Sequence, residues 1–577
     1  MKNFNRAMEN LKDGLSSVTK GAFFSALVFG LLAHMVVMTG DFPNHDGLRY
    51  LYSDLDNIVA GRWFLAAVCG ISSYFALPWL IGVLSILYIG IAAALTCSVL
   101  KIRNKYSAIV IGALMATFPA LASTFAYVFT MDGYMLGLLM AVAAVYFTKK
   151  FRFGWIGGAV LLAFSLGTYQ AYLPVAVILS LYAAVLILMG EDGKSVISNA
   201  DGDPDKGKGR ESEDNAKTKI FNILRFLYMG ILGGGLYFVI LKVLLKVRGL
   251  ELASYQGADS ISLGAAQGTN VAGSAAEQVA SQAAGAASAG LISKIIAAYK
   301  DFAVFSVRSK VLAPNVFVWI ALGILTGASL MLLLREIVKK KWYKSQVLYI
   351  AVILIAAIYP VASNVVMIVM GDVTYHAIMR YQWVLIPIIL IALCDRLAYK
   401  PEYYAVKEGR ESFVKLVTWL IPVLGCIIVF CYIVTDNIGY SNLQKKYERT
   451  YAYCERLLDR IEQTDGYYPG IPIAMIGVVS EDQYPKVDLT EGVTDNLIGL
   501  SGDYLCYKGA DYKHFFKAYL GADLNIISGE KMGEIYNSEE YVLMDSFPGK
   551  TSVKLVDGTI YVKTENIDYG LREKYGK

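Results

Sequence analysis

The sequence predicts a polytopic α-helical membrane protein with a small α/β domain at its C-terminal end. Hydrophobic residues make up 56% of the 577 residues and charged residues only 18%, and the mean hydropathy is +0.47. A water-soluble domain of this size does not reach such values. The apolar residues also form runs long enough to cross a bilayer, with short basic stretches between them.

Apolar windows of about 20 residues predict about eleven membrane spans. The predicted spans are centred on Phe24 to Met38, Pro78 to Leu100, Ile109 to Ala122, Tyr134 to Phe147, Ile156 to Leu166, Tyr172 to Leu188, Ile223 to Leu245, Phe317 to Leu334, Leu348 to Val369, Val384 to Leu393 and Val414 to Val434.

Clusters of Lys and Arg give the expected orientation, because basic loops stay in the cytoplasm. The clusters are Lys2/Arg6/Lys12/Lys20, Lys101/Arg103/Lys105, Lys149/Lys150/Arg152, Arg335/Lys339/Lys340/Lys341/Lys344 and Arg396/Lys400/Lys407/Arg410. They place residues 1–20 in the cytoplasm, a transmembrane domain at 21–435 and a tail, 436–577, outside. The same clusters account for the net charge of +5, so we expect membrane lipid and no nucleic acid as a partner.

Two loops differ from the rest in composition. Residues 191–219 mix acids and bases with Gly, Ser and Asn, which is typical of a disordered cytoplasmic connector. Residues 254–290 are a low-complexity outer loop rich in Ala, Gly, Ser and Gln. After this loop, Ile292, Ile296 and Tyr299 fall on one face of a predicted amphipathic helix, which suits a helix on the outer membrane surface.

The tail is polar enough to fold in water as a small α/β domain. A helix is expected from Asn442 to Ile461 and a strand from Ile473 to Val479. Two further strands, Ser552 to Val556 and Thr559 to Lys563, flank Asp557-Gly558. Asp-Gly between two strands is a strong hairpin signal, because a type I′ turn needs positive φ at both central residues.

The first outer loop holds the best candidates for catalysis. Asp41 and Asp46 follow the first span directly and precede a predicted surface helix beginning near Leu48. A carboxylate at an apolar boundary has a raised pKa, which makes it a better proton acceptor for a hydroxyl. The alternative is that both acids are solvated loop residues or helix caps.

Other polar residues lie at the outer ends of spans, where they could meet the same site. They are Asp132, Tyr169 with Gln170, and His376 with Arg380. Acids and bases are scarce in the middle of the spans, which argues against an ion-coupled transporter. The four histidines are scattered without zinc-ligand spacing, so we expect no metal site and no cofactor, with a divalent cation left as an open alternative.

Four short segments together resemble the bacterial Gtr-type membrane glucosyltransferases, which belong to the GT-C class. The segments are Asn44-His45-Asp46-Gly47-Leu48-Arg49, Gly61-Arg62, Thr130-Met131-Asp132-Gly133-Tyr134-Met135 and Gly167-Thr168-Tyr169-Gln170-Ala171.

The resemblance implies an inverting transfer of a sugar, glucose in that family, on the outer face of the bacterial inner membrane. The donor would be a polyprenyl-phosphate sugar and the acceptor a cell-surface glycan. Where the family tends to have two adjacent acids, this chain has His45-Asp46. The resemblance therefore assigns the base to Asp46, with Asp41 as its substitute, and Asp132 to the acceptor.

The same resemblance makes Arg49, Arg62 and Arg380 candidates for the donor phosphate, and Tyr169, Gln170 and His376 further candidates for substrate binding. A guanidinium provides a planar fork of permanent charge for a leaving phosphate. The alternative for each arginine is anchoring to lipid headgroups. Two other functions stay open, namely a transporter or flippase of a lipid-linked glycan and a lipid-linked glycan polymerase or ligase.

Overall fold

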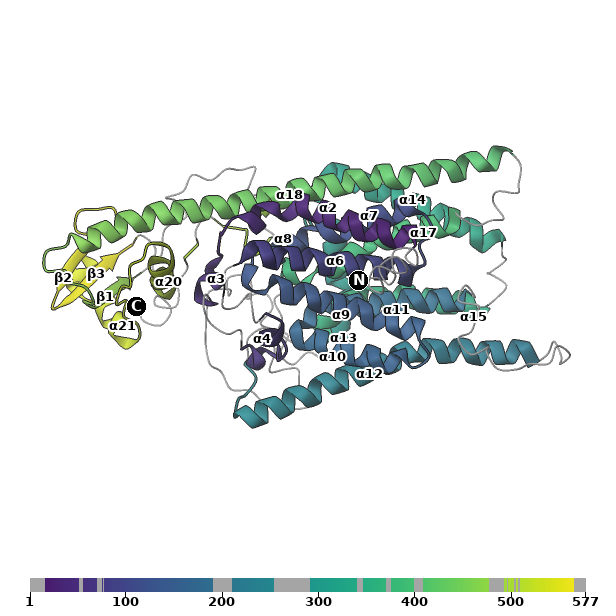
Figure 1. Cartoon of the computed structure of the whole chain (residues 1–577), viewed down its shortest axis with the longest axis horizontal. Coiled ribbons are helices and arrows are strands. Elements are labelled where there is room, and N and C mark those ends of the chain that lie inside the picture. Colours follow the sequence, from purple (N-terminus) through teal and green to yellow (C-terminus); the bar gives the residue numbers. More distant parts are fainter. Residues whose placement is uncertain are drawn as a thin grey trace, which may run out of the picture.

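The structure is a computed structural model, and it describes residues 16–50, 56–69, 75, 77–189, 210–253, 291–339, 346–369, 375–398, 408–476, 492–494, 497–502, 505–506 and 509–564. A bundle of long helices forms the body, and a small α/β module extends from one end of it (Figure 1). We call this the module end of the bundle and the other the opposite end. The bundle consists of α2 (Ser17–Thr39), α6 (Pro78–Leu100), α7 (Lys105–Thr117), α8 (Pro119–Phe125), α9 (Met131–Lys150), α10 (Gly154–Thr168), α11 (Leu173–Leu188), α12 (Arg210–Arg248), α14 (Val316–Lys339), α15 (Gln346–Ser363), α17 (Leu385–Ala398) and α18 (Glu408–Glu462).

Further helical segments connect the bundle helices on the side of the module. They are α3 (His45–Tyr50), η1 (Ile58–Ala60), α4 (Leu65–Val68), η2 (Val128–Thr130), η3 (Gln170–Tyr172), α13 (Leu291–Arg308), α16 (Val365–Val369), η7 (Ala377–Met379) and η8 (Tyr381–Val384).

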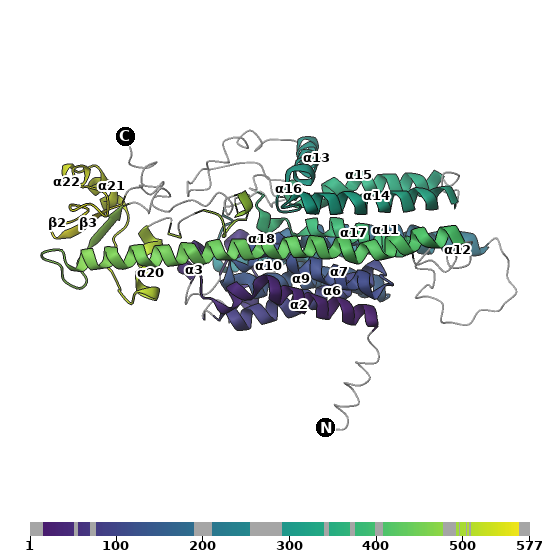
Figure 2. The ribbon, with the colours of Figure 1, turned by 90° about the horizontal axis from the view of Figure 1, so that it is seen from above.

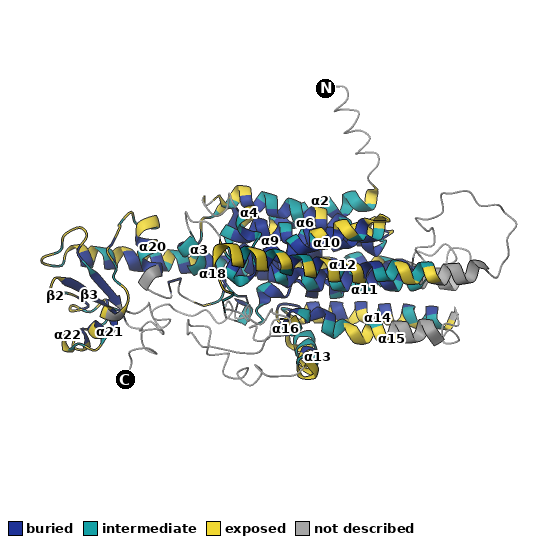
Figure 3. Ribbon diagram, turned by 90° about the horizontal axis from the view of Figure 1, so that it is seen from below, coloured by how far each residue is buried: buried dark blue, intermediate teal, exposed yellow. Residues whose placement is uncertain are grey.

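The predicted class, a polytopic helical membrane protein, is confirmed. In the described residues, eight helices are long and apolar enough to cross a membrane, or nine if the bent pair α7 and α8 is one span. The remaining predicted spans correspond to the shorter apolar helices Gly154–Thr168 and Ile353–Ser363. Buried residues fill the middle of the bundle, while exposed ones follow the outer side of α12 (Figure 3). There Ile231, Val239 and Val243 are each more than half exposed, as expected of a surface that faces lipid.

A break between α7 and α8 shapes the centre of the bundle. Phe118 is extended (φ −64°, ψ 128°) and the axis bends by 43°, because the residue before a proline avoids the helical region and Pro119 has no N–H to donate. The carbonyls of Met115 and Ala116 therefore lose their usual helical partners, and in an apolar interior such groups must find others.

Side chains from two other helical segments supply those partners. The Tyr381 hydroxyl donates to the Met115 carbonyl at 2.7 Å, and Nε2 of His34 lies 2.8 Å from the Ala116 carbonyl. Because a carbonyl only accepts, Nε2 of His34 carries the proton, and Nδ1 accepts from the Tyr440 hydroxyl at 2.7 Å. These bonds join α2 and α18 to the break.

Basic residues, among them Lys101, Arg103 and Lys149, flank the helices at the opposite end. Polar contacts hold the loops between helices there. The Asp395 carboxylate accepts from the backbone N–H groups of Arg103 (2.9 Å) and Asn104 (3.1 Å). Lys149 donates to the Val99 carbonyl at 2.7 Å.

One helix crosses the predicted boundary between the transmembrane domain and the tail. α18 is continuous over 55 residues from Glu408 to Glu462, and it runs from the opposite end into the module (Figures 1 and 2). The predicted helix from Asn442 to Ile461 is its final part. No proline interrupts the helix between Val434 and Asn442, and Gly439 allows close packing against Leu500.

Two loop predictions meet the structure only in part. α12 begins at Arg210, so the disordered connector predicted over 191–219 is wrong for residues 210–219, and the rest lies outside the described residues. The low-complexity loop 254–290 also lies outside them. The helix predicted after it is α13, which runs across the direction of α14 and α15 (Figure 2) and leaves Ile292 and Ile296 exposed.

The module contains a three-stranded sheet in the order β1-β3-β2, with β1 (Ile473–Ile476) parallel to β3 (Thr559–Lys563) and β2 (Val553–Val556) antiparallel to it. Asp557 (φ 44°) and Gly558 (φ 73°) form the turn, which confirms the predicted hairpin. The module helices are α20 (Gly509–Tyr519), α21 (Glu530–Tyr536) and α22 (Glu539–Val542).

The Tyr381→Phe variant should lose stability, because it leaves the Met115 carbonyl without its hydroxyl partner in an apolar interior. We expect a cost of about 1–3 kcal/mol, read as a lower Tm in detergent micelles. The control is Tyr106→Phe, since the Tyr106 side chain is 52% exposed. Equal Tm values for the two variants would contradict this account of the break.

Candidate functional site

The helix α3 presents the residues predicted for catalysis, and Asn44 fixes where it begins. The Asn44 side chain is buried, accepts from the Gly47 N–H at 2.8 Å and donates to the Ala126 carbonyl at 2.9 Å. The amide thus caps α3 and ties it to the chain that follows α8. On the inner face Leu48 is fully buried, so the opposite face of α3 points away from the bundle.

Five ionisable side chains gather on that face and form what we call the α3 cluster: His45, Asp46, Arg49, Lys446 and Asp511. Arg49 lies between the two acids, with Nε 2.7 Å from Oδ1 of Asp511 and Nη1 3.8 Å from Oδ1 of Asp46. Nε2 of His45 is 3.6 Å from the Asp46 carboxylate.

The α3 cluster contains two buried side chains and two that are accessible from outside. Asp511 is fully buried, and Lys446 is buried with its ammonium 2.9 Å from the Ser501 carbonyl. The side chains of Asp46 and Arg49 keep 34% and 32% of their surface exposed, so an incoming molecule can reach both. Burial lowers the pKa of His45, and the nearby Asp46 and Asp511 charges oppose that shift; its imidazole is therefore neutral at neutral pH.

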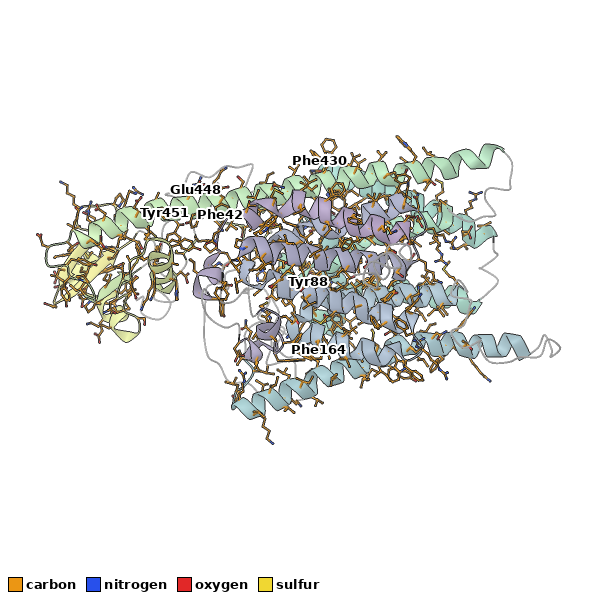
Figure 4. All side chains as sticks on the ribbon, viewed as in Figure 1. Phe42, Tyr88, Phe164, Phe430, Glu448 and Tyr451 are labelled. Atoms are coloured by element: carbon orange, nitrogen blue, oxygen red, sulfur yellow. The ribbon has the colours of Figure 1, made fainter. Side chains whose placement is uncertain are left out.

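Asp41 lies apart from the α3 cluster, on the side of α20. Burial raises the pKa of its carboxyl, and a hydrogen bond from Tyr519 partly counters the shift. Beside it, Phe42 packs on Tyr447 with ring centroids 5.8 Å apart, next to the part of α18 that carries Glu448 and Tyr451 (Figure 4). The two predicted candidates for the base therefore occupy different surroundings.

A second group, which we call the Tyr169 cluster, consists of Arg62, Tyr134, Tyr169 and Gln170. The Arg62 guanidinium lies 5.0 Å from the Tyr169 ring centroid and donates to the Tyr134 hydroxyl at 3.1 Å, while the rings of Tyr134 and Tyr169 stack 4.4 Å apart. Gln170 donates to the Ala60 carbonyl at 3.1 Å. The predicted substrate residues Tyr169 and Gln170 thus hold the loop that carries Arg62.

Asp132 lies in the first turn of α9 and is 5% exposed. One carboxylate oxygen accepts from the Gly133 N–H at 2.9 Å, and a negative charge in this position is favoured by the helix dipole. Asp132 is joined to α3 by the preceding turn, η2, where Phe129 stacks on Tyr50 with centroids 5.4 Å apart.

Arg380 is the predicted arginine whose contacts least suit the donor phosphate. Both its terminal nitrogens bond the two Asp301 oxygens, at 2.7 and 2.8 Å, and its guanidinium lies 4.1 Å from the Tyr375 ring centroid and 4.3 Å from that of Phe305. A phosphate would have to compete with this buried pair. His376 precedes η7 in the same region, and burial, together with the Arg380 charge, lowers its pKa.

Two members of the α3 cluster were not predicted from the sequence. Lys446 and Asp511 reach the site from α18 and α20, and no motif surrounds either one.

Among the described residues, no group of three or more His, Cys, Asp or Glu side chains could hold a metal ion.

The long apolar helices of the bundle define a multi-pass membrane protein, with ionisable side chains gathered at the module end of the bundle. The family described as Glucosyl transferase GtrII matches residues 35–391, and the chain belongs to this family. It is therefore a glycosyltransferase. No curated protein and no solved structure matches the chain.

The Gly133→Ala variant should disrupt the packing beside Asp132. A Cβ at residue 133 would lie 2.2 Å from Sγ of Cys69, so we expect a loss of about 1–3 kcal/mol. Gly157→Ala is the control, because nothing lies within 4 Å of its added Cβ. We expect the Tm in detergent to fall for Gly133→Ala and to stay unchanged for Gly157→Ala. A larger fall for Gly157→Ala than for Gly133→Ala would contradict the packing.

The Arg380→Gln variant should act on stability, since it leaves Asp301 without its bidentate partner. The expected loss is about 3 kcal/mol, measured as a lower denaturation temperature. The double variant Arg380→Gln/Asp301→Asn should recover part of it, because no unpaired charge remains. If Arg380→Gln folds as stably as the wild type, the ion pair is not a structural element.

Proposed function

We propose that the protein transfers a sugar, glucose by the description of its family, from a polyprenyl-phosphate donor to a hydroxyl of a cell-surface glycan. The observation that carries this proposal is the pair of Asp46 and Arg49, both accessible and both on the short helix that follows the first span, α2. We propose that this end of the bundle lies at the membrane boundary. A lipid-linked donor needs a site at such a boundary, because its sugar is polar while its chain stays in hydrocarbon.

The proposed reaction is a single inverting displacement. The Asp46 carboxylate takes the proton of the acceptor hydroxyl, the hydroxyl oxygen forms a bond to the anomeric carbon, and the bond from that carbon to the phosphate oxygen breaks. The electron pair of the broken bond stays on the phosphate. Negative charge grows there, and a guanidinium stabilises it.

Arg49 and Arg62 are the arginines proposed for that charge. Both are partly exposed at the module end, whereas Arg380 is buried and is paired with Asp301. Asp132 is proposed for the acceptor. We propose no cofactor, and a divalent cation remains an open alternative.

The proposed orientation places the module end outside a bacterial inner membrane and the N-terminus in the cytoplasm. The basic residues Lys101, Arg103 and Lys149 at the opposite end support it. The family match favours the glycosyltransferase over a transporter or flippase of a lipid-linked glycan. A lipid-linked glycan polymerase or ligase would use the same boundary site.

The test is transfer of labelled glucose from polyprenyl-phosphate glucose in membranes that contain the protein. Asp46→Asn keeps the shape of the side chain and removes the base, so we expect the rate to fall by about 100-fold or more. The control is Asp523→Asn, whose carboxylate is exposed in the module and pairs with Lys517 at 2.9 Å.

Asp41→Asn separates the two candidates for the base. If Asp46→Asn transfers glucose at the wild-type rate and Asp41→Asn is much slower, then Asp41 is the general base. Wild-type membranes that transfer no sugar from this donor would refute the proposed donor.

A further inference from the structure

An ion pair links the module to the helix that carries the candidate base, and its acid, Asp511, lies outside the residues matched by the family. Asp511 of α20 is fully buried and accepts from Nε of Arg49 at 2.7 Å. Arg49 in turn lies 3.8 Å from Asp46. A buried carboxylate is costly unless it is paired, so the guanidinium is held on the side of Asp511, with Nη1 left facing Asp46.

A second contact fixes the chain that leads into α3. Tyr519, two turns after Asp511 on the same helix, bonds the Asp41 side chain. Phe42 packs on Tyr447 of α18, and Tyr447 packs on Tyr519 with ring centroids 5.3 Å apart. The segment from Asp41 to Arg49 is thus bonded to the module at both of its ends.

A third contact reaches the neighbouring loop. Residues 497–502 are held to α18, since Asn442 donates to the Leu500 carbonyl at 2.6 Å and Lys446 to the Ser501 carbonyl at 2.9 Å. In this loop Gly499 has φ +86° and approaches Tyr127 so closely that an added Cβ would lie 2.9 Å from the ring. The module therefore contacts both chain segments that meet at α3.

We infer that Asp511 is a positioning residue for the transfer site, and that the C-terminal module completes this site by fixing Arg49 and, through it, Asp46. The inference rests on the proposed function of Asp46. Asp511 itself touches no reacting atom. Its effect is on geometry, and displacement of a reacting group by about 1 Å costs on the order of 100-fold in rate.

The experiment compares Asp511→Asn, Asp511→Glu, Arg49→Gln and the double variant Asp511→Asn/Arg49→Gln in the glucose transfer assay. Asp511→Asn should lose about 10- to 100-fold in rate, and Asp511→Glu should recover part of that loss because it restores the carboxylate. The double variant should be no slower than Arg49→Gln alone, since both changes remove one interaction. Asp523→Asn is the control within the module.

Hydrogen exchange of the same proteins in lipid nanodiscs gives a measure that does not depend on activity. In Asp511→Asn the amides of α3 should exchange faster than in the wild type, while the amides of β2 and β3 stay protected and show that the module is folded.

The outcomes separate this inference from the proposed function. A wild-type transfer rate and wild-type exchange of α3 in Asp511→Asn would overturn the inference, and so would losses that multiply in the double variant. If the wild type itself transfers no glucose, the proposed function fails, and the exchange of α3 alone decides whether Asp511 positions it.

Discussion

The break between α7 and α8 is the constraint on which the arrangement of the site depends. Pro119 and the extended Phe118 release two carbonyls in an apolar interior, and side chains from α2 and the start of η8 must lie where they can donate to them. Tyr440 of α18 in turn donates to the α2 side chain, His34. The bend also carries the chain over the module end, where Ala126 accepts from Asn44 and Tyr127 faces His45 with ring centroids 6.5 Å apart. One interruption of helical hydrogen bonding thus locates α2, α18 and α3 relative to one another.

The sequence predicted those features that depend on local chemistry. Hydropathy alone located the spans, because a helix in lipid satisfies its own backbone and needs only apolar side chains, and the Asp557-Gly558 turn followed from its φ requirement. The family resemblance brought forward Asp46, Arg49 and Arg62, which the structure places at one end of the bundle.

The features that sequence reasoning missed depend on partners far apart in the chain. The resemblance made Arg380 a candidate for the donor phosphate, and nothing in the sequence indicates that Asp301, on another helix, binds both of its terminal nitrogens. Nothing near Asp511 or Lys446 indicates that either one meets α3, since 462 positions separate Asp511 from Arg49. The continuity of α18 was also missed, because the last span and the helix from Asn442 to Ile461 were predicted as separate elements on either side of a domain boundary at residue 435.

The length of α18 has a mechanical consequence. At about 1.5 Å per residue, its 55 residues form a rod of roughly 80 Å that is rooted among the spans and reaches the sheet. Because one unbroken helix joins the two parts of the chain, the module keeps a fixed bearing relative to the spans and has no loose linker about which to swing.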